Sequence, residues 1–199
     1  MAEPDEIQAK LERSFKVIKQ IQDAFSNEDI PCVLIGGYAV RLWGGVRVTE
    51  DIDLAVYKGD SIEPLRVLKR LFGEGQVRFH PSGDPADPFL ATMEVQPPGC
   101  FPIEVLNYNY QQDHGRAIGV ALKDPVTKNI ADVDVHVCSL ESLIVLKLLA
   151  SGARDLEDVH TLVGEHDSDL NFERVREVLS RVGRSELFER YFSEVEEEE

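Results

Sequence analysis

Residues 33–56, VLIGGYAVRLWGGVRVTEDIDLAV, place the strongest constraint on how this chain can fold. An apolar run leads into a pair of glycines, a short helical segment (38–43) follows, two further glycines end it, and a second apolar strand carries Asp51 and Asp53. Side chains two positions apart in a strand point to the same face about 7 Å apart, so the two aspartates present their carboxylates together. The segment therefore predicts a strand, a tight turn, a short helix and a second strand with two neighbouring carboxylates.

The glycine pair and the aspartates indicate a site for a phosphate and a metal ion. Gly36 and Gly37 allow the backbone to approach a ligand closely, and amides at the start of a helix attract anions. Two adjacent carboxylates repel each other unless a cation lies between them, and oxygen ligands beside a phosphate favour Mg²⁺ or Mn²⁺. We therefore expect the phosphates of a nucleotide and a metal ion on Asp51 and Asp53 to be neighbours.

The motif resembles that of the nucleotidyltransferase superfamily, which includes DNA polymerase beta. In that family Gly-Gly or Gly-Ser precedes Asp-x-Asp or Asp-x-Glu by about ten residues, as Gly36-Gly37 precedes Asp51-Ile52-Asp53 here. The residues Arg47 to Glu50 look like those of the AbiEii-type toxin and antibiotic nucleotidyltransferase branch. The resemblance extends over about residues 5–180, although its sharp motif covers only 36–53.

The resemblance implies an α/β (α+β) fold with a mixed sheet flanked by helices, an N-terminal helix and a C-terminal helical segment. It implies transfer of a nucleoside monophosphate from a nucleoside triphosphate to a hydroxyl acceptor, with release of pyrophosphate and with Mg²⁺ or Mn²⁺ held by Asp51 and Asp53. The acceptor could be a small molecule, a protein or an RNA. The alternative is a non-catalytic nucleotide-binding or scaffold protein that keeps the fold.

The family takes a third carboxylate from a later strand, and Glu104 in the strand 101–106 is our candidate. It would act as a general base toward the acceptor hydroxyl or as a third metal ligand; the other interpretation is an edge-strand glutamate that faces water. Asp132 and Asp134 are rival candidates, because the alternating strand 131–138 places them on one face with His136. That pattern is also typical of a solvated edge strand, which we favour.

The nucleotide-binding residues implied by the resemblance are Gly36, Gly37, Arg47, Thr49 and Lys147. Lys147 lies in the nearly all-apolar helix 140–150, where a lysine is either a surface residue with a buried stem or, as the resemblance suggests, one that approaches the nucleotide.

Four features elsewhere in the chain lie outside this motif. Arg116 could contact phosphate, and the turn-rich segment 81–85 could cover the site. His80, next to a proline-rich loop, is expected to be a surface residue. Residues 154–158 are expected to form a charge network at the start of a helix, through Arg154, Asp155 and Asp158.

Hydrophobic periodicity and turn residues predict the remaining elements. We expect helices at 6–25, 62–72 (capped by Ser61, ended by Gly73), 140–150 (capped by Ser139, ended by Gly152), 172–179 and 185–195, strands at 32–35, 76–80, 89–95, 101–106 and 131–138, and irregular structure at 107–127. These divide into a nucleotidyltransferase core (1–138), a helical segment packed on it (139–195) and an acidic tail (196–199).

The net charge of −16 disfavours broad binding to DNA or RNA, which requires basic side chains against phosphates. No apolar run is long enough for a membrane span and the N-terminus lacks a signal-peptide pattern, so we expect a cytoplasmic protein. Cys32, Cys100 and Cys138 show neither metal-binding spacing nor an even number for disulfides, and Cys32 and Cys138 are expected to be buried thiols. Nothing in the sequence indicates an oligomeric state.

Overall fold

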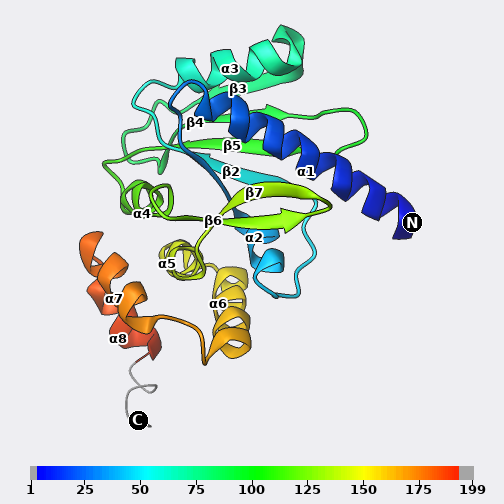
Figure 1. The fold of residues 1–199 in the computed structure, drawn as a ribbon. Helices are drawn as coiled ribbons and strands as arrows, with labels where there is room; N and C mark the ends of the chain where they lie inside the picture. Colours follow the sequence, from blue (N-terminus) through cyan, green and yellow to red (C-terminus); the bar gives the residue numbers. More distant parts are fainter. Residues whose placement is uncertain (1–3, 193–199) are drawn as a thin grey trace.

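The computed structural model describes residues 4–192 and shows one seven-stranded mixed sheet with helices on both faces (Figure 1). The elements in chain order are α1 (Pro4–Ser26), β1 (Cys32–Ile35), α2 (Gly36–Leu42), β2 (Ile52–Val56), α3 (Ile62–Phe72), the 3₁₀ turn η1 (Glu74–Gln76), β3 (Val77–Pro81), β4 (Phe89–Val95), β5 (Ile103–Tyr108), α4 (Asp113–Ala121), β6 (Pro125–Ile130), β7 (Val133–Cys138), α5 (Leu140–Ala150), α6 (Ala153–His166), α7 (Phe172–Arg181) and α8 (Ser185–Phe192). The α/β architecture expected from the sequence is confirmed.

The strand order is β3-β4-β5-β2-β1-β7-β6, which places β2 near the centre of the sheet. β2 pairs antiparallel with β1 and parallel with β5. In this register Asp53 lies between Ile35, the last residue of β1, and Glu104 of β5. The two ends of β2 therefore face different surroundings: its start adjoins the end of β1, and its end adjoins the start of β1.

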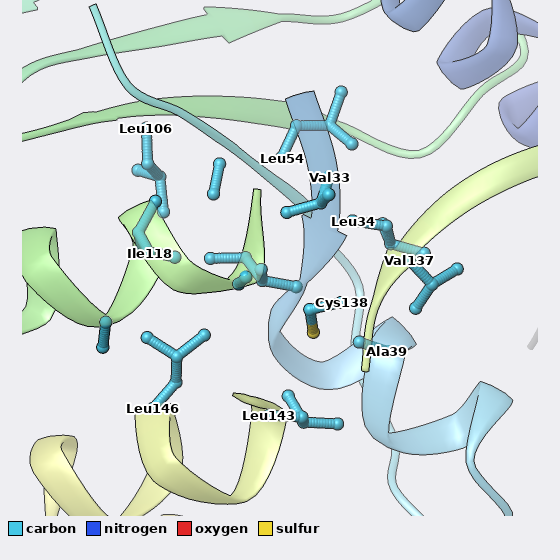
Figure 2. Packing of buried hydrophobic residues seen from close by; sticks show 14 of the residues in the cluster. Val33, Leu34, Ala39, Leu54, Leu106, Ile118, Val137, Cys138, Leu143 and Leu146 are labelled. Atoms are coloured by element: carbon cyan, nitrogen blue, oxygen red, sulfur yellow. The ribbon is translucent and has the colours of Figure 1, made fainter. Parts of the chain in front are cut away.

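Helices cover both faces of the sheet. α1 and α3 pack together on one face, while α2, α4 and α5 cover the other, with α6, α7 and α8 further out (Figure 1). Figure 2 shows Ile118 of α4 beside Leu106 of β5, and Leu143 and Leu146 of α5 at the base of the same cluster. α5 is apolar on nearly all sides because α4, α6, α7 and α2 surround it.

The segment 107–127, expected to be irregular, is ordered. β5 continues to Tyr108, α4 follows, and β6 begins at Pro125 as the edge strand beside β7. β6 alternates between exposed and half-buried positions at the sheet edge, where little apolar surface is needed. Its sequence is therefore too polar to be recognised as a strand. The sequence prediction was wrong here.

Helix ends agree with the sequence prediction in part. The Ser139 side chain accepts a hydrogen bond from the Ser142 amide, and Gly73 ends α3 with a φ of 92°. Ser61 makes no capping bond, because the Asp60 side chain accepts from the Ile62 amide instead. α5 ends at Ala150, and its C-cap is Ser151 in the left-handed conformation rather than Gly152, which precedes α6.

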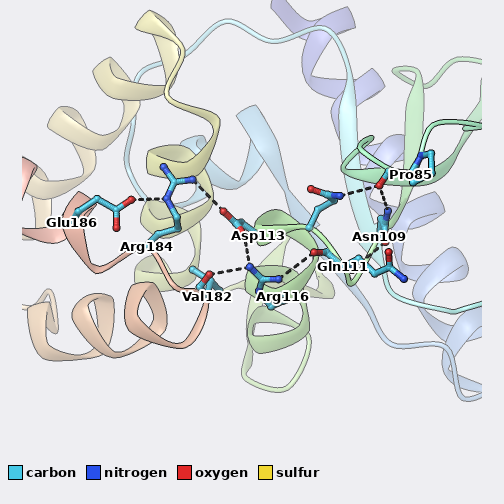
Figure 3. A network of polar contacts seen from close by, with 9 residues as sticks. Pro85, Asn109, Gln111, Asp113, Arg116, Val182, Arg184 and Glu186 are labelled. Carbon is cyan, nitrogen blue, oxygen red and sulfur yellow. Dashed lines mark hydrogen bonds and ion pairs between the residues drawn. The ribbon is translucent and has the colours of Figure 1, made fainter.

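Two buried asparagines at the end of β5 fix loops that the sequence did not connect. Asn107 bonds to both backbone polar groups of Lys58 and to the Ser61 hydroxyl. Asn109 donates to the carbonyls of Pro85 and Asp87, which holds the β3–β4 loop at this end of the sheet (Figure 3).

Three smaller expectations have clear outcomes. Cys32 and Cys138 are buried, as predicted. The predicted helix 185–195 is observed as α8, with residues 193–195 and the acidic tail 196–199 outside the described residues. Among the helices of residues 4–192, none is long and apolar enough to cross a membrane.

Candidate active site at the start of strand β2

The start of β2 packs directly against the start of α2. Gly36 has a φ of +67°, and a Cβ atom there would lie 1.9 Å from Oδ2 of Asp53. A Cβ on Gly37 would lie 2.9 Å from the Cβ of Thr49 and 3.2 Å from Nε of Arg47. The glycine pair is therefore needed so that the side chains of Asp53, Thr49 and Arg47 can lie against the first turn of α2.

The two aspartates differ in their surroundings. Asp51 is exposed and accepts a hydrogen bond of 2.7 Å from the Thr49 hydroxyl. Asp53 is largely shielded from solvent, and no hydrogen bond is recorded for its carboxylate in residues 4–192. One carboxylate is thus held by its own loop, and the other faces inward toward the site.

An in-register row of charged residues crosses the sheet at this point. Asp53 on β2 is opposite Glu104 on β5, Glu104 is opposite Glu94 on β4, and Glu94 is opposite Arg78 on β3. The Cβ atoms of directly opposite residues lie about 5 Å apart, so Asp53, Glu104 and Glu94 occupy neighbouring positions on the sheet. A hollow of about 370 Å³ runs along this row and is lined by Arg78, Glu94 and Glu104.

The crowding of carboxylates changes their acidity. Burial, followed by the charges of Asp51 and Glu104, raises the pKa of Asp53 to about 7, against the opposing effect of Lys147 and Arg47. Burial, Glu94 and Asp51 also raise the pKa of Glu104 above its usual range, with His80 acting in the opposite direction. The negative charge at this end of the sheet is therefore only partly compensated by the protein itself.

A buried ion network lies beside Asp53 and joins the site to the C-terminal helices. Nζ of Lys147 lies 2.7 Å from Oδ1 of Asp155 and 2.8 Å from Oδ2 of Asp158, and Asp158 also pairs with Arg47. Lys147 is only 7% exposed, so the interpretation of this residue as a surface lysine is wrong. Nε of Arg47 is buried and has no hydrogen-bond partner among residues 4–192.

The charge network expected at 154–158 is observed for its acids. Asp155 and Asp158 bind Lys147, whereas Arg154 is exposed and no ion pair is recorded for it within the described chain. The acids therefore connect α6 to α5 rather than to a basic neighbour within α6.

The donor set suits a metal ion shared with a substrate rather than one held by the protein alone. Across residues 4–192, no three His, Cys, Asp or Glu side chains are grouped so that they could hold a metal ion. Asp51 and Asp53 nonetheless supply adjacent carboxylates whose negative charge Lys147 and Arg47 compensate only in part, and Mg²⁺ commonly takes one or two carboxylates together with substrate phosphates. The residues present fit a metal ion of that kind.

The other sequence candidates lie elsewhere. Asp134 and His136 are exposed on β7, which is separated from β2 by β1, and Asp132 lies in the β6–β7 turn. His80 is a surface residue, as predicted, with Nε2 at 3.5 Å from Glu94. The loop at 81–85 lies at the opposite end of the sheet, beside Asn109, so the expectation that it covers this site was wrong.

Two residues of the site have contacts that were not predicted from the sequence. Glu94 is in the charged row because β3, β4 and β5 pair in register, and its alternation with the buried Met93 and Val95 is the only sequence signal. Asp158 contacts both Arg47 and Lys147, which are 111 and 11 positions away, so no local pattern indicates its role.

Comparison with known proteins supports this architecture. No family model and no curated protein sequence matches the chain. Among solved structures, an antigenic nucleotidyltransferase-like protein from Paracoccidioides brasiliensis has a TM-score of 0.53 at 18% identity, covering 92% of this chain and 90% of that chain. The antibiotic-resistance factor ANT(2'')-Ia has a TM-score of 0.50 at 16% identity, covering 92% and 96%, and its complex with adenylyl-2''-tobramycin has the same score and identity, covering 89% and 98%. This protein therefore has the nucleotidyltransferase fold that the motif at 36–53 predicts.

Proposed function

We propose that this protein is a metal-dependent nucleotidyltransferase that transfers a nucleoside monophosphate from a nucleoside triphosphate to a hydroxyl group and releases pyrophosphate. The observation that carries the proposal is the position of Asp53, whose carboxylate lies against Gly36 at the start of α2 and is in register with Glu104 on the next strand. The fold shared with nucleotidyltransferases supports it.

Asp51 and Asp53 are the residues that would hold Mg²⁺ or Mn²⁺. When bound, the metal would neutralise charge on the triphosphate and polarise the reacting oxygens. The backbone of Gly36 and Gly37, with Thr49 and the side chains of Arg47 and Lys147, would orient the phosphates. Glu104 would accept the proton of the acceptor hydroxyl; its raised pKa brings it nearer to neutral pH than that of an ordinary glutamate, which suits a general base.

We further propose that the acceptor is a small molecule that carries positive charge. The hollow of about 370 Å³ beside Glu104 is lined by two glutamates and one arginine of the charged row, which leaves it acidic, and its volume suits a small ligand. The net charge of −16 favours a cationic acceptor and disfavours RNA. The neighbour ANT(2'')-Ia, solved with adenylyl-2''-tobramycin, is consistent with a small-molecule acceptor.

The alternative is a nucleotide-binding protein without catalysis. The observation that favours it is that Asp51, Asp53 and Glu104 do not form a ready metal-binding cluster within the described residues. The two functions differ in their dependence on Glu104. A catalytic protein should lose turnover in Glu104→Gln and still bind triphosphate, whereas a binding protein should show no turnover in either form.

The first test is a titration of ATP, GTP, CTP and UTP, each with and without Mg²⁺, followed by thermal shift and calorimetry. Native protein is compared with Asp51→Asn and with the matched control Asp132→Asn, an exposed aspartate whose left-handed conformation (φ 61°) asparagine accepts readily. We expect magnesium-dependent stabilisation by at least one triphosphate, lost in Asp51→Asn and kept in Asp132→Asn. Absence of binding by every triphosphate would refute the proposal.

A further inference from the structure

A second cavity lies at the opposite end of the sheet from Asp51 and Asp53. Its volume is about 400 Å³, and it is lined by Pro31, which precedes β1, Tyr57, which follows β2, and residues of α4 and the end of α7. Asp53 and Tyr57 are four residues apart on an extended strand, a separation of about 13 Å. This cavity, termed here the tyrosine cavity, is therefore separate from the candidate active site.

The lining of the tyrosine cavity is positively charged, whereas the molecule as a whole is negatively charged. Arg116, Lys123 and Arg181 line it, and no aspartate or glutamate of the described residues 4–192 does, although the chain has 37 acidic and 21 basic residues. Arg116 is paired with Asp113 and Arg181 with Glu177. Lys123 is exposed and has no ion pair among residues 4–192, so it supplies the uncompensated positive charge.

Two tyrosines supply an aromatic wall. The ring centroids of Tyr57 and Tyr110 are 5.3 Å apart with their planes inclined at 44°. Tyr110 is 55% exposed, and neither phenol hydroxyl has a recorded hydrogen bond within the described part of the chain. The rings offer apolar faces and the hydroxyls offer free donors to a ligand that is both aromatic and polar.

The basic side of the cavity is held in place before any ligand arrives. Arg116 donates to the carbonyls of Gln111 and Val182, each at 3.1 Å, and to the Asp113 carboxylate. Arg184 extends this network from Asp113 to Glu186 (Figure 3). Because α4 and the α7–α8 turn are joined in this way, ordering the site on ligand binding would cost little conformational entropy.

We propose that the tyrosine cavity binds a small anion with an aromatic ring, of the class of a nucleoside monophosphate, without a metal ion. The ring packs on Tyr57 and Tyr110, and the anionic group lies against Lys123 and the two arginines. No carboxylate of residues 4–192 lines the cavity, so it lacks the charged oxygen ligands that hold a divalent cation in a protein site. The sequence singled out Arg116 as a phosphate contact, and this cavity gives that residue a ligand distinct from the triphosphate of the active site.

The test is calorimetric titration of AMP in the presence of EDTA, with adenosine and inorganic phosphate as partial probes. The variants are Lys123→Gln, Tyr110→Leu and the matched control Lys16→Gln, an exposed lysine of α1 with no recorded partner in residues 4–192. Each of these positions is exposed, so the variants should fold. We expect AMP to bind native protein and Lys16→Gln with equal affinity. Its affinity for Lys123→Gln and for Tyr110→Leu should be lower by about fivefold or more.

Adenosine and phosphate should each bind more weakly than AMP, because each offers only half of the recognised chemistry. Three outcomes would overturn the proposal: no AMP binding by native protein, equal binding by native protein and both cavity variants, or phosphate binding as tightly as AMP. Omitting divalent metal separates this test from that of the active site, which requires Mg²⁺.

Discussion

The two ends of strand β2 differ in how far their polar groups are compensated by neighbouring groups of the protein. At its start, Asp53 and Glu104 are adjacent carboxylates: burial with the charges of Asp51 and Glu104 raises the pKa of Asp53, and burial with the charges of Glu94 and Asp51 raises that of Glu104. Beyond its end, Asn107 and Arg116 are satisfied by several hydrogen bonds each. Satisfied groups stabilise a fold, whereas crowded like charges cost stability and persist where a ligand is to supply the missing charge.

The ion network of the candidate active site compensates the negative charge of Asp53 only in part. Lys147 and Arg47 oppose the rise in the pKa of Asp53, but each is also paired with Asp158. Their charge is thus divided between structural acids and the site. The start of β2 keeps a negative surplus that a metal ion would remove.

The largest expected effect comes from Asp53→Asn, which removes one carboxylate of the surplus. We expect the magnesium-dependent part of triphosphate affinity to fall about 100-fold, and turnover with any accepted hydroxyl compound to fall about 1,000-fold or more. Calorimetry and pyrophosphate release measure these effects. Asp134→Asn, an exposed acid on β7, is the control and should behave as native protein. Similar losses in both variants would show that general charge, not the site, is responsible.

Lys147→Met tests whether the ion network compensates the acids. Removing the lysine leaves Asp155 without its recorded partner and Asp158 with only Arg47, so we expect a loss of about 3 to 5 kcal/mol in the free energy of unfolding. Urea unfolding measures it, and Lys16→Met, at an exposed position without a recorded partner in residues 4–192, should change stability by less than about 0.5 kcal/mol. A small change in Lys147→Met would mean that the buried pairs contribute little.

The sequence was most informative where chemistry and local geometry coincide. Asp53 lies on β2 and Asp51 directly before it, Gly36 and Gly37 form the first turn of α2, and the motif that joins them was sufficient to predict the fold class. Apolar strands and amphipathic helices were also recognised, because burial imposes a periodicity.

Partners that depend on tertiary packing were not recognised. Glu94 joins the charged row only through the register of three strands, and Asp158 contacts Arg47 across 111 positions. Edge strand β6 was missed because half of it faces water. The Tyr57–Tyr110 contact, which brings together the end of one strand and a distant loop, has no local signal at all.

The pH dependence of stability should reveal the surplus charge directly. The pKa of Asp53 is raised from 3.8 to about 7 in the folded state. Between these two pH values the folded protein therefore keeps a proton on Asp53 that the unfolded chain has lost. Stability should therefore fall by about 2 to 3 kcal/mol from pH 5 to pH 8 without metal, and level off above pH 7. Urea unfolding measures the slope, which should be flatter in Asp53→Asn and in native protein with Mg²⁺. An unchanged slope in Asp53→Asn would assign the effect to other groups.

The smallest expected effect concerns Gly36, which has no side chain and so allows Asp53 of β2 to lie against the first turn of α2. Gly36→Ala would place a methyl group 1.9 Å from Oδ2 of Asp53 at a φ of +67°, so Asp53 must move and the backbone is strained. We expect a loss of about 2 kcal/mol in unfolding free energy. Gly59→Ala is the control, because no atom of the described residues lies within 4 Å of its added Cβ and its φ is not positive. If Asp53 moves as expected, Gly36→Ala should also weaken magnesium-dependent triphosphate binding, whereas AMP binding at the tyrosine cavity should be unchanged. A loss of both would show that the two ends of β2 are not independent.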